Sequence, residues 1–255
     1  LADTQALTDN IGNIGKVRES VLDVVMDYLA VGIDPQKTTI CVQSHLPALA
    51  ELSLLYLNFV SVGRLQRNPT VKEEVRARGF EKSIPAGFLC YPAGHPLLEE
   101  VEAIVPKAGR LPGVDGASKM SKSAGNAIRL SASPAEISAA VNAMYTDPNH
   151  LKVQDPGQVE GNVVFTYLDA FHTDAEEVEA LKAHYRRGGL GDVTLKKRLD
   201  GILQTFLEPV RDRRSQLEQD PDYIRDIVRD GTQKARSLTE QTRSEIYDGL
   251  GLFRL

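Results

Sequence analysis

Five consecutive residues near the middle of the chain have the composition of a loop that closes over a triphosphate. The stretch Lys119-Met120-Ser121-Lys122-Ser123 places two lysines three residues apart and interleaves them with small hydroxyl side chains. Ammonium groups at this spacing can match the charge that builds up on a departing pyrophosphate, while hydroxyl and backbone N–H groups hold the loop in place. A solvated basic turn is the alternative, but a chance match to all five residues has odds of about one in ten thousand. We therefore favour the phosphate-binding interpretation.

Length, composition and charge are those of an ordinary globular protein. The 255 residues are 42% hydrophobic and 25% charged, which allows one large domain or two modest ones. No apolar run approaches a membrane span, and both cysteines, Cys41 and Cys90, sit in apolar stretches without zinc spacing. We therefore expect a cytoplasmic protein with reduced thiols, no membrane association and no protein-bound metal. Because the net charge is −5, any nucleic acid must bind to a local basic face.

The first half of the chain has the pattern of a parallel α/β fold. Residues 16–28 carry apolar side chains at helical spacing, and residues 38–42 form a β-branched run without alternation, as expected for a strand buried on both faces. Residues 1–3 look like the end of another strand, so these three segments predict a β–α–β unit with parallel strands and a right-handed crossover. Residues 49–60 indicate a further helix, and residues 68–78 a surface helix or loop.

The second half of the chain has helical patterns only. A start signal stands at Ser133, which can act as N-cap because Pro follows it and Glu occupies the third helical position. Residues 174–187 predict a second helix, and residues 195–218 a third, which Pro209 would kink or split. Residues 222–252 predict one or two more.

The loop and the segments around it resemble one family. A KMSKS sequence at the carboxyl edge of an α/β domain, followed by a helical domain, resembles the class I aminoacyl-tRNA synthetases. Further segments resemble the bacterial tryptophanyl-tRNA synthetases, so the resemblance covers the chain almost end to end. In the helical half these segments are MYTDPNH (144–150), VEGNVVFTYLDAF (159–171), GGLGDVTLKK (188–197) and LEPVRDRR (207–214). In the first half they are LADTQALT (1–8), VQSHLPALAEL (42–52) and AGFLCYP (86–92).

This resemblance implies a two-domain organisation. Residues 1–130 would form the catalytic domain, with a Rossmann-type, doubly wound parallel sheet, and would end in the KMSKS loop. Residues 131–255 would form an all-α helical domain that binds the tRNA anticodon. Family members are homodimers that bury a face of the Rossmann domain. The apolar residues Leu54, Leu55 and Leu57 suit such an interface or the core equally well.

The resemblance also implies a reaction and the residues that serve it. Tryptophan would be activated by ATP, with Mg²⁺, to tryptophanyl-adenylate and pyrophosphate, and then transferred to the terminal ribose of tRNA(Trp). In-line attack of a carboxylate on the α-phosphorus requires mainly positioning and charge stabilisation from the protein. Lys119 and Lys122 would be catalytic because they would stabilise the leaving pyrophosphate. The residues that would bind ATP are Met120, against the adenine, Ser121, Ser123 and Lys72, the last of which is equally compatible with a solvated lysine.

Three residues match the family's amino-acid site. Tyr91 matches the tyrosine of a YP segment that lines the indole pocket, although a core tyrosine fits its apolar flanks equally well. Asp3 and Gln5 fall at the family's acidic-x-His position, where Gln5 replaces the usual histidine. A neutral amide can hydrogen-bond the substrate but cannot titrate, so this contact differs from the family's pattern.

Two basic clusters in the helical half are candidates for tRNA binding. Neutralising phosphates requires Lys and Arg side chains, but acidic residues are interspersed here, so solvated helix faces are the alternative. The five histidines show no metal spacing and receive no role. The first cluster comprises Lys196, Lys197 and Arg198, and the second comprises Arg211, Arg213 and Arg214.

Two signatures of the family are absent. The HIGH-type motif that binds ATP phosphates belongs upstream of Leu1, and we expect further residues before this one because the sequence begins without Met. The stretch that carries an aspartate for the indole N–H and a GEDQ-like turn belongs between Pro92 and His95, where this sequence has no room for it. We interpret the sequence as ordered segments of a longer chain. The alternative is a damaged or non-catalytic paralogue.

Four functions are compatible with these observations. An active tryptophan–tRNA ligase leads, because an idle loop has no reason to keep both lysines. The others are a non-catalytic tRNA-binding or regulatory paralogue, a tyrosine–tRNA ligase, and an unrelated ATP-using nucleotidyl transferase. The buried acceptor that meets the substrate side chain would separate tryptophan from tyrosine, and it belongs to the absent stretch.

Overall fold

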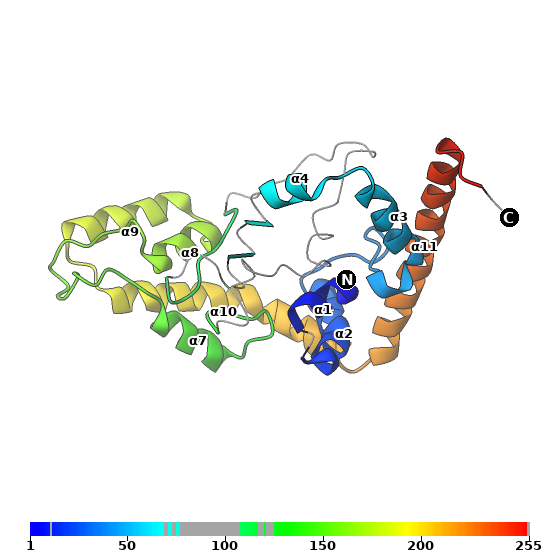
Figure 1. Cartoon of the computed structure of the whole chain (residues 1–255). Coiled ribbons are helices and arrows are strands. Elements are labelled where there is room, and N and C mark those ends of the chain that lie inside the picture. The colour runs from blue at the N-terminus through cyan, green and yellow to red at the C-terminus, as the bar shows by residue number, and fades with distance from the viewer. Residues whose placement is uncertain are drawn as a thin grey trace. The chain divides into compact units, whose positions relative to one another are not determined.

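The computed structural model describes residues 1–10, 12–68, 71–72, 75–76, 108–116, 120 and 125–253. Within these residues the regular structure is helical and no strand is assigned (Figure 1). None of the described helices is long and apolar enough to cross a membrane. The elements are α1 (Asp3–Asn10), α2 (Ile14–Ala30), the 3-10 helix η1 (Gln43–His45), α3 (Pro47–Leu57), α4 (Val62–Arg67), α7 (Pro134–Ala143), α8 (Val163–Phe171), α9 (Ala175–Arg187), α10 (Asp192–Leu217) and α11 (Pro221–Gly249).

The chain divides into two compact units. Residues 1–101 and 217–255 form the first unit, and residues 102–216 form the second. The described helices of the first unit are α1 to α4, η1 and α11, whereas the second unit contains α7 to α9 and all but the last residue of α10. The predicted division into a catalytic domain that ends at residue 130 and a helical domain that begins at residue 131 stays a prediction.

The strand end predicted at the amino terminus begins a helix instead. Asp3 opens α1, where a carboxylate in the first turn is stabilised by the helix dipole. The backbone of Leu1 nevertheless bonds to the segment predicted as a strand. Its amino group donates to Cys41 O at 2.6 Å, and Gln43 N–H donates to Leu1 O at 2.9 Å. These two bonds have the pattern of parallel strands, but no strand is assigned at residues 38–42, so the doubly wound sheet stays a prediction.

Two helices of the first unit confirm the apolar spacing of the sequence. α2 contains the helix predicted over residues 16–28 and starts earlier, because the Asn13 side chain accepts a hydrogen bond of 3.1 Å from the N–H of the third helical residue. α3 confirms the helix predicted over residues 49–60 and has Pro47 in its first turn. The element predicted over residues 68–78 lies mostly outside the described residues.

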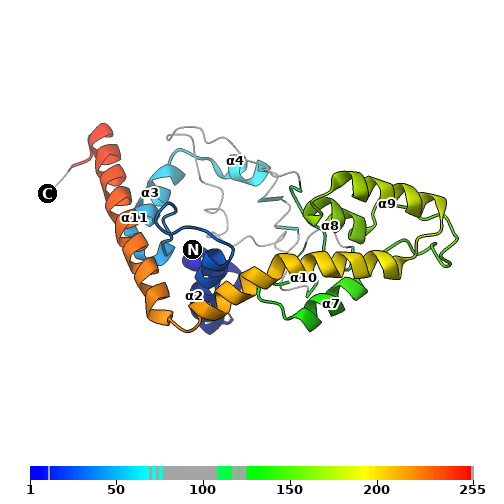
Figure 2. The same cartoon turned by 180° about the vertical axis from the view of Figure 1, so that it is seen from behind.

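α11 closes the first unit by crossing the segment that precedes η1. Gly231 lies so close to this segment that a Cβ atom there would be 2.2 Å from Ile40 O. One residue later, Thr232 Oγ1 accepts a hydrogen bond from Val42 N at 3.2 Å. Beyond the crossing, α11 runs beside α3, as both views show (Figures 1 and 2). The core at the crossing consists of Val25, Ile40 and Ile224.

α10 organises the second unit, with α7 on one side and α8 and α9 on the other (Figure 2). It runs unbroken through Pro209, so the predicted splitting of this helix is wrong. Four leucines on successive turns of α10 are buried, and this burial outweighs the backbone hydrogen bond that proline removes. The leucines are Leu195, Leu199, Leu203 and Leu207.

The predicted start signal of α7 is confirmed. Ser133 Oγ accepts a hydrogen bond from Glu136 N at 3.3 Å, and the Glu136 carboxylate accepts one from Ser133 N at 2.8 Å. The two residues thereby satisfy each other's backbone groups, which is the capping box that their spacing predicts.

Gly231→Ala tests the crossing of α11. We expect it to lower the free energy of unfolding by about 1–3 kcal/mol, because the new methyl group would meet the Ile40 carbonyl. Helix propensity alone predicts the opposite sign, a gain of about 1 kcal/mol. Gly201→Ala in α10 is the matched control, since nothing lies within 4 Å of its Cβ position. Urea unfolding followed by circular dichroism measures both variants. An equal gain in the two would contradict the close crossing.

Candidate functional site

The predicted residues of the catalytic site are described only in part. Met120 lies within the described residues, and its side chain packs against the hydrophobic core of the second unit. The backbone is therefore the part of Met120 that is left for the predicted contact with adenine. Lys72 is exposed. Outside the described residues lie Lys119, Ser121, Lys122, Ser123 and Tyr91.

The two ends of the KMSKS loop are tied together by a loop base, which comprises residues 113–116 and 125–126. Asn126 is buried and donates from Nδ2 to both carboxylate oxygens of Asp115, at 3.0 and 3.1 Å. Gly113 is required beside them, because a Cβ there would be 2.1 Å from Nδ2 of Asn126. These residues were not predicted from the sequence, although the glycines on both sides of the loop were a signal for close backbone approach.

The loop base is connected to the core of the second unit. Val114 N–H donates to Asn126 O at 3.0 Å, and Tyr145 N–H donates to Val114 O at 2.8 Å. The Tyr167 hydroxyl donates to Pro112 O at 2.9 Å. Burial raises the pKa of Tyr167 to about 12, so this hydroxyl keeps its proton at neutral pH. Both ends of the loop are therefore fixed by backbone and buried side-chain contacts.

A polar network joins three of the segments on which the family resemblance rests. Tyr185 Oη donates to Asp192 Oδ1 at 2.8 Å, and the other carboxylate oxygen lies 3.3 Å from His150 Nδ1. Asn162 Nδ2 donates to Tyr185 Oη at 3.5 Å. Burial, followed by the hydrogen bond to Asp192, raises the pKa of Tyr185. The network holds residues 144–162 against α9 and α10, so His150, to which the sequence assigned no role, is a structural residue.

Two residues predicted to meet the amino acid contact η1. Asp3 Oδ1 accepts a hydrogen bond from Ser44 N at 2.9 Å. Partial burial opposes ionisation of Asp3, but the hydrogen bonds from Ser44 outweigh it and lower the pKa of the carboxyl. Gln5 N–H donates to Gln43 Oε1 at 3.3 Å. These contacts fix the start of α1, and a role in substrate binding stays a prediction for both residues.

The first predicted tRNA-binding cluster is partly engaged in the fold. Lys196 Nζ donates to Asn142 O at 2.8 Å, and burial lowers the pKa of this ammonium group. Arg198 forms an ion pair with Glu177. Lys197 is exposed and is therefore the most available cation of this cluster.

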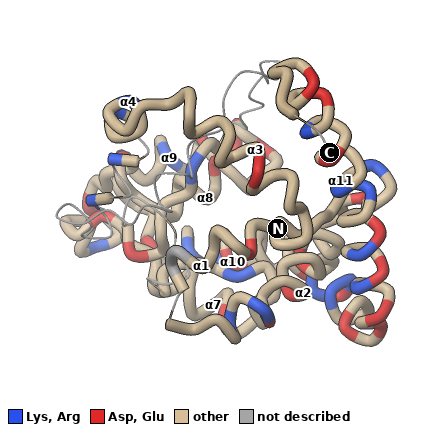
Figure 3. Tube along the Cα trace, turned by 45° about the vertical axis from the view of Figure 1, so that its right-hand side comes forward, with Lys and Arg blue, Asp and Glu red and all other residues tan. Residues whose placement is uncertain are grey.

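The second predicted cluster differs in exposure along α10. Arg213 is exposed, whereas Arg211 and Arg214 are half-buried, and each of these two has a buried Nη1 atom. Acidic and basic residues alternate along the neighbouring helix in the sequence, α11, as Figure 3 shows. The charged side chains of α11 therefore do not extend the cluster into one basic surface, and tRNA binding by the cluster stays a prediction.

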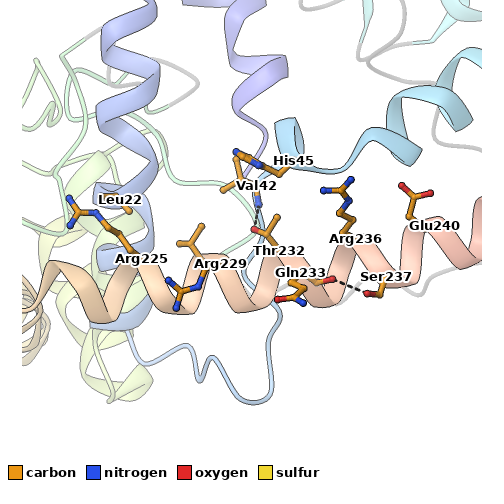
Figure 4. A pocket seen from close by; sticks show the side chains of 11 residues that line it. Leu22, Val42, His45, Arg225, Arg229, Thr232, Gln233, Arg236, Ser237 and Glu240 are labelled. Carbon is orange, nitrogen blue, oxygen red and sulfur yellow. Dashed lines mark hydrogen bonds between the residues drawn. The ribbon is translucent and has the colours of Figure 1, made fainter.

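A cavity of about 780 Å³ lies in the first unit beside α11 (Figure 4). None of the predicted substrate-binding or RNA-binding residues that the structure describes lines it. Arg236 extends from α11 on the side where His45 lies, and Arg225 and Arg229 are each paired with an aspartate at 2.7 Å.

Across the described part of the chain, no group of three His, Cys, Asp or Glu side chains is placed to hold a metal ion.

Known proteins match nearly the whole chain. A family model described as tRNA synthetases class I (W and Y) matches residues 1–93 and 94–208. The tryptophan–tRNA ligase of Clostridium longisporum is 48% identical over 292 residues, which cover 99% of this chain and 86% of that protein. The tryptophan–tRNA ligase of Lactococcus lactis is 44% identical over 295 residues, with the same two coverages. The crystal structure of tryptophanyl-tRNA synthetase from Campylobacter jejuni complexed with ADP and tryptophan is 24% identical, with a TM-score of 0.73 over 99% of this chain and 88% of that one.

The matches are interrupted inside the chain. The family model breaks between residues 93 and 94, which is where the family resemblance would place the stretch with the GEDQ-like turn. The alignment with the Clostridium protein spans 292 residues, whereas this chain has 255. The relative therefore has residues that have no counterpart in this sequence.

The turn that contains Asp147 predicts a dependence on pH. The Asp147 carboxylate accepts from Asn149 N at 2.9 Å and from Gln158 N at 2.8 Å, and these bonds lower its pKa. A folded-state pKa below the unfolded value means that the carboxylate stabilises the fold at neutral pH and that this contribution is lost as the pH falls through the folded-state pKa. Asp147→Asn should lower the thermal midpoint at neutral pH and have progressively less effect below about pH 4. Thermal unfolding across this range measures it, with the exposed Asp212→Asn as control; a deficit that is equal at every pH would contradict the assignment.

Proposed function

We propose that this chain, which belongs to the class I tRNA synthetases for tryptophan and tyrosine, is a tryptophan–tRNA ligase. The observation that carries the proposal is the 48% identity to a tryptophan–tRNA ligase over 99% of the chain. The reaction would activate tryptophan with ATP and transfer it from the adenylate to tRNA(Trp). Mg²⁺ would enter with the phosphates of ATP, to which it binds in preference to all-protein sites.

The activation step requires positive charge at the leaving group. The tryptophan carboxylate attacks the α-phosphorus, the bond from that phosphorus to the bridging oxygen breaks, and pyrophosphate leaves with the electron pair. Lys119 and Lys122 would stabilise this charge, and Ser121 and Ser123 would donate hydrogen bonds to the phosphates or to the closed loop. The loop base supports this assignment, because it holds both ends of the loop together at one place.

The remaining substrate contacts are proposed from the family pattern. Tyr91, Asp3 and Gln5 would meet tryptophan, and Lys72 would meet the triphosphate. The backbone N–H of Gln5 is anchored to Gln43, so the start of α1 is fixed independently of any substrate. An amide at Gln5 would both donate and accept without titrating, which makes this contact independent of pH.

Transfer requires tRNA binding, for which we propose the two basic clusters of α10. Lys197 and Arg213, which are exposed, would contact phosphates directly, whereas Arg198 is exposed but paired with Glu177. Arg211 and Arg214 would contribute charge from half-buried positions. Lys196 would contribute less, because it is half-buried and one of the three N–H donors of its ammonium group already binds a backbone carbonyl of α7.

The organisation of the protein follows the same proposal. Residues 1–130 would form a Rossmann-type catalytic domain and residues 131–255 a helical anticodon-binding domain, in a cytoplasmic homodimer. The parallel bonding at Leu1 and the TM-score of 0.73 to a tryptophanyl-tRNA synthetase support the catalytic domain.

One observation favours a second candidate function. The family model matches residues 1–93 and 94–208 as two segments, and the family pattern would place the indole acceptor and the GEDQ-like turn at the break between them. A chain without them would be a non-catalytic tRNA-binding or regulatory paralogue. ATP–pyrophosphate exchange on the purified protein, with tryptophan and tyrosine in parallel, separates the candidates. Exchange with tryptophan alone supports the ligase, exchange with tyrosine would reassign the substrate, and no exchange would favour the paralogue.

Lys122→Ala tests the leaving-group role. We expect the exchange rate to fall about 10²- to 10³-fold, while tryptophan binding changes little, because the ammonium group would act only where charge develops. Exchange kinetics and equilibrium binding of tryptophan measure the two effects. Lys152→Ala, at an exposed lysine of the second unit, is the control. Equal losses in rate and binding would show that Lys122 acts in the ground state as well.

The salt dependence of tRNA binding tests the basic clusters. Replacing Lys197 and Arg213 together with glutamine should weaken binding of tRNA(Trp) and lower the slope of log Kd against log salt by about one for each phosphate that is no longer neutralised. Filter binding over a series of salt concentrations measures the slope, with Lys234→Gln as an exposed control. A weaker complex with an unchanged slope would point to a structural role for these residues.

A further inference from the structure

A second cavity, of about 540 Å³, opens in the second unit where α8 ends against the middle of α10. None of the described residues predicted for ATP binding or for the amino-acid site lines it. Its walls combine aromatic, cationic and hydroxyl side chains, which sets it apart from an ordinary groove between helices. The residues that line it include Phe171, His172, Glu177, Arg198, Thr205 and Phe206.

The apolar wall consists of two phenyl rings. The ring centroids of Phe171 and Phe206 are 5.3 Å apart, with an interplanar angle of 55°. Phe171 is held from behind by Tyr167, whose ring centroid is 5.9 Å away. Phe206 is 51% exposed, so one ring of the pair presents a large part of its surface to solvent. A planar ligand can therefore stack on Phe206 without moving the core.

The polar wall is an ordered set of three side chains. Asp174 N–H donates to Nδ1 of His172 at 3.0 Å, so in the neutral ring the proton is on Nε2, which donates to Glu177 Oε2 at 3.1 Å. The other carboxylate oxygen of Glu177 accepts from Nη2 of Arg198. Each carboxylate oxygen keeps a second lone pair, and the guanidinium keeps further N–H donors. The wall thus offers donors and acceptors side by side.

We propose that this cavity receives one unpaired nucleobase of the bound tRNA, stacked on Phe206 with a carbonyl or ring-nitrogen acceptor toward Arg198 and an exocyclic amino group toward Glu177. The inference rests on the proposed function, which supplies the RNA. Unpaired bases in RNA are recognised by stacking on aromatic rings and by hydrogen bonds to their edges. Cytosine, adenine and guanine carry the amino group that this arrangement requires, and uracil does not.

Other occupants fit this wall less well. A phosphate would be repelled by the Glu177 carboxylate, which already neutralises Arg198. An aliphatic side chain of a protein partner would cover the ion pair without replacing its hydrogen bonds to water. A nucleobase can stack on the phenyl ring and also hydrogen-bond the ion pair, because it is flat and apolar on its faces and polar at its edge.

Phe206→Ala is the direct test. We expect the Kd for an in-vitro transcript of tRNA(Trp) to rise about 5- to 150-fold, which corresponds to the roughly 1–3 kcal/mol that stacking contributes for one base. Phe206→Leu should raise the Kd nearly as much, because leucine keeps apolar volume but has no aromatic ring. Phe206→Tyr keeps a ring and should restore binding. Val193→Ala, at a position of α10 that is 80% exposed and does not line the cavity, should leave the Kd unchanged.

The base itself is located by removing one nucleobase of the anticodon loop at a time from the transcript. At one position, removing the base should weaken binding to the parent protein as much as Phe206→Ala weakens binding of intact RNA. Because both changes would remove the same stacking contact, the abasic RNA and Phe206→Ala together should raise the Kd little further. Replacing that base with uracil should weaken binding to the parent and have less effect on Glu177→Gln. Full additivity at every position of the loop, or an unchanged Kd for Phe206→Ala and Phe206→Leu, would overturn the proposal.

This test and the test of the proposed function fail separately. ATP–pyrophosphate exchange by the parent protein reports on the proposed function and requires no RNA. Exchange with tryptophan together with RNA affinity that does not depend on Phe206 would reject the cavity alone. Absence of exchange together with affinity that depends on Phe206 would reject the ligase and keep the cavity, and absence of any tRNA binding would reject the cavity.

Discussion

The carboxylate of Asp192 is the contact on which the second unit depends. It accepts the Tyr185 hydroxyl with one oxygen and faces His150 with the other, at the start of α10. Hydrogen bonds to a charged group contribute about 1.5–3 kcal/mol each, and a partner left alone in this half-buried place would be costly. Through His150 the network holds the irregular segment 144–162, and through Tyr145 in that segment the helical core is bonded to the loop base. The ends of the KMSKS loop are therefore positioned by interactions that begin at a helix terminus far along the chain.

The first unit depends on a steric constraint instead. α11 approaches the segment before η1 at Gly231 more closely than any side chain would allow, and Thr232 then accepts a hydrogen bond from that segment. The carboxyl-terminal helix is in this way part of the same compact unit as the amino-terminal helices. An ion pair of 2.8 Å between Arg243 and Glu51 extends the contact to α3, but exposed pairs of this kind contribute little by themselves. Close backbone packing, rather than charge, joins the two ends of the sequence.

The loop base and all but the last residue of α10, the helix that carries both basic clusters, belong to the same compact unit. The loop base and the residues beside it share one hydrophobic core with α10, because Val114, Leu111 and Ile128 pack against the cluster that contains Leu195 and Leu199. The position of this core determines which cationic side chains of α10 are exposed. Lys196 turns inward to a carbonyl of α7, whereas Lys197, one residue later, is exposed and free to meet solvent or RNA. One hydrophobic stripe thus decides both the packing of the helix and which charges remain for a partner.

The sequence by itself determined the family, the helices over residues 16–28, 49–60 and 174–187, and the capping box at Ser133, because these follow from local spacing and from residue order. It did not reveal the helix start at Asp3, the continuity of α10 through Pro209, the loop base or the network around Asp192. Each of these depends on partners that are distant in the sequence, such as Asp192 for Tyr185 and His150, or on burial that outweighs a local propensity, as at Pro209. Which lysines and arginines of a basic cluster stay exposed was likewise decided only by the tertiary structure. The charge of each side chain follows from the sequence, but only the tertiary structure decides which charged groups are paired or buried.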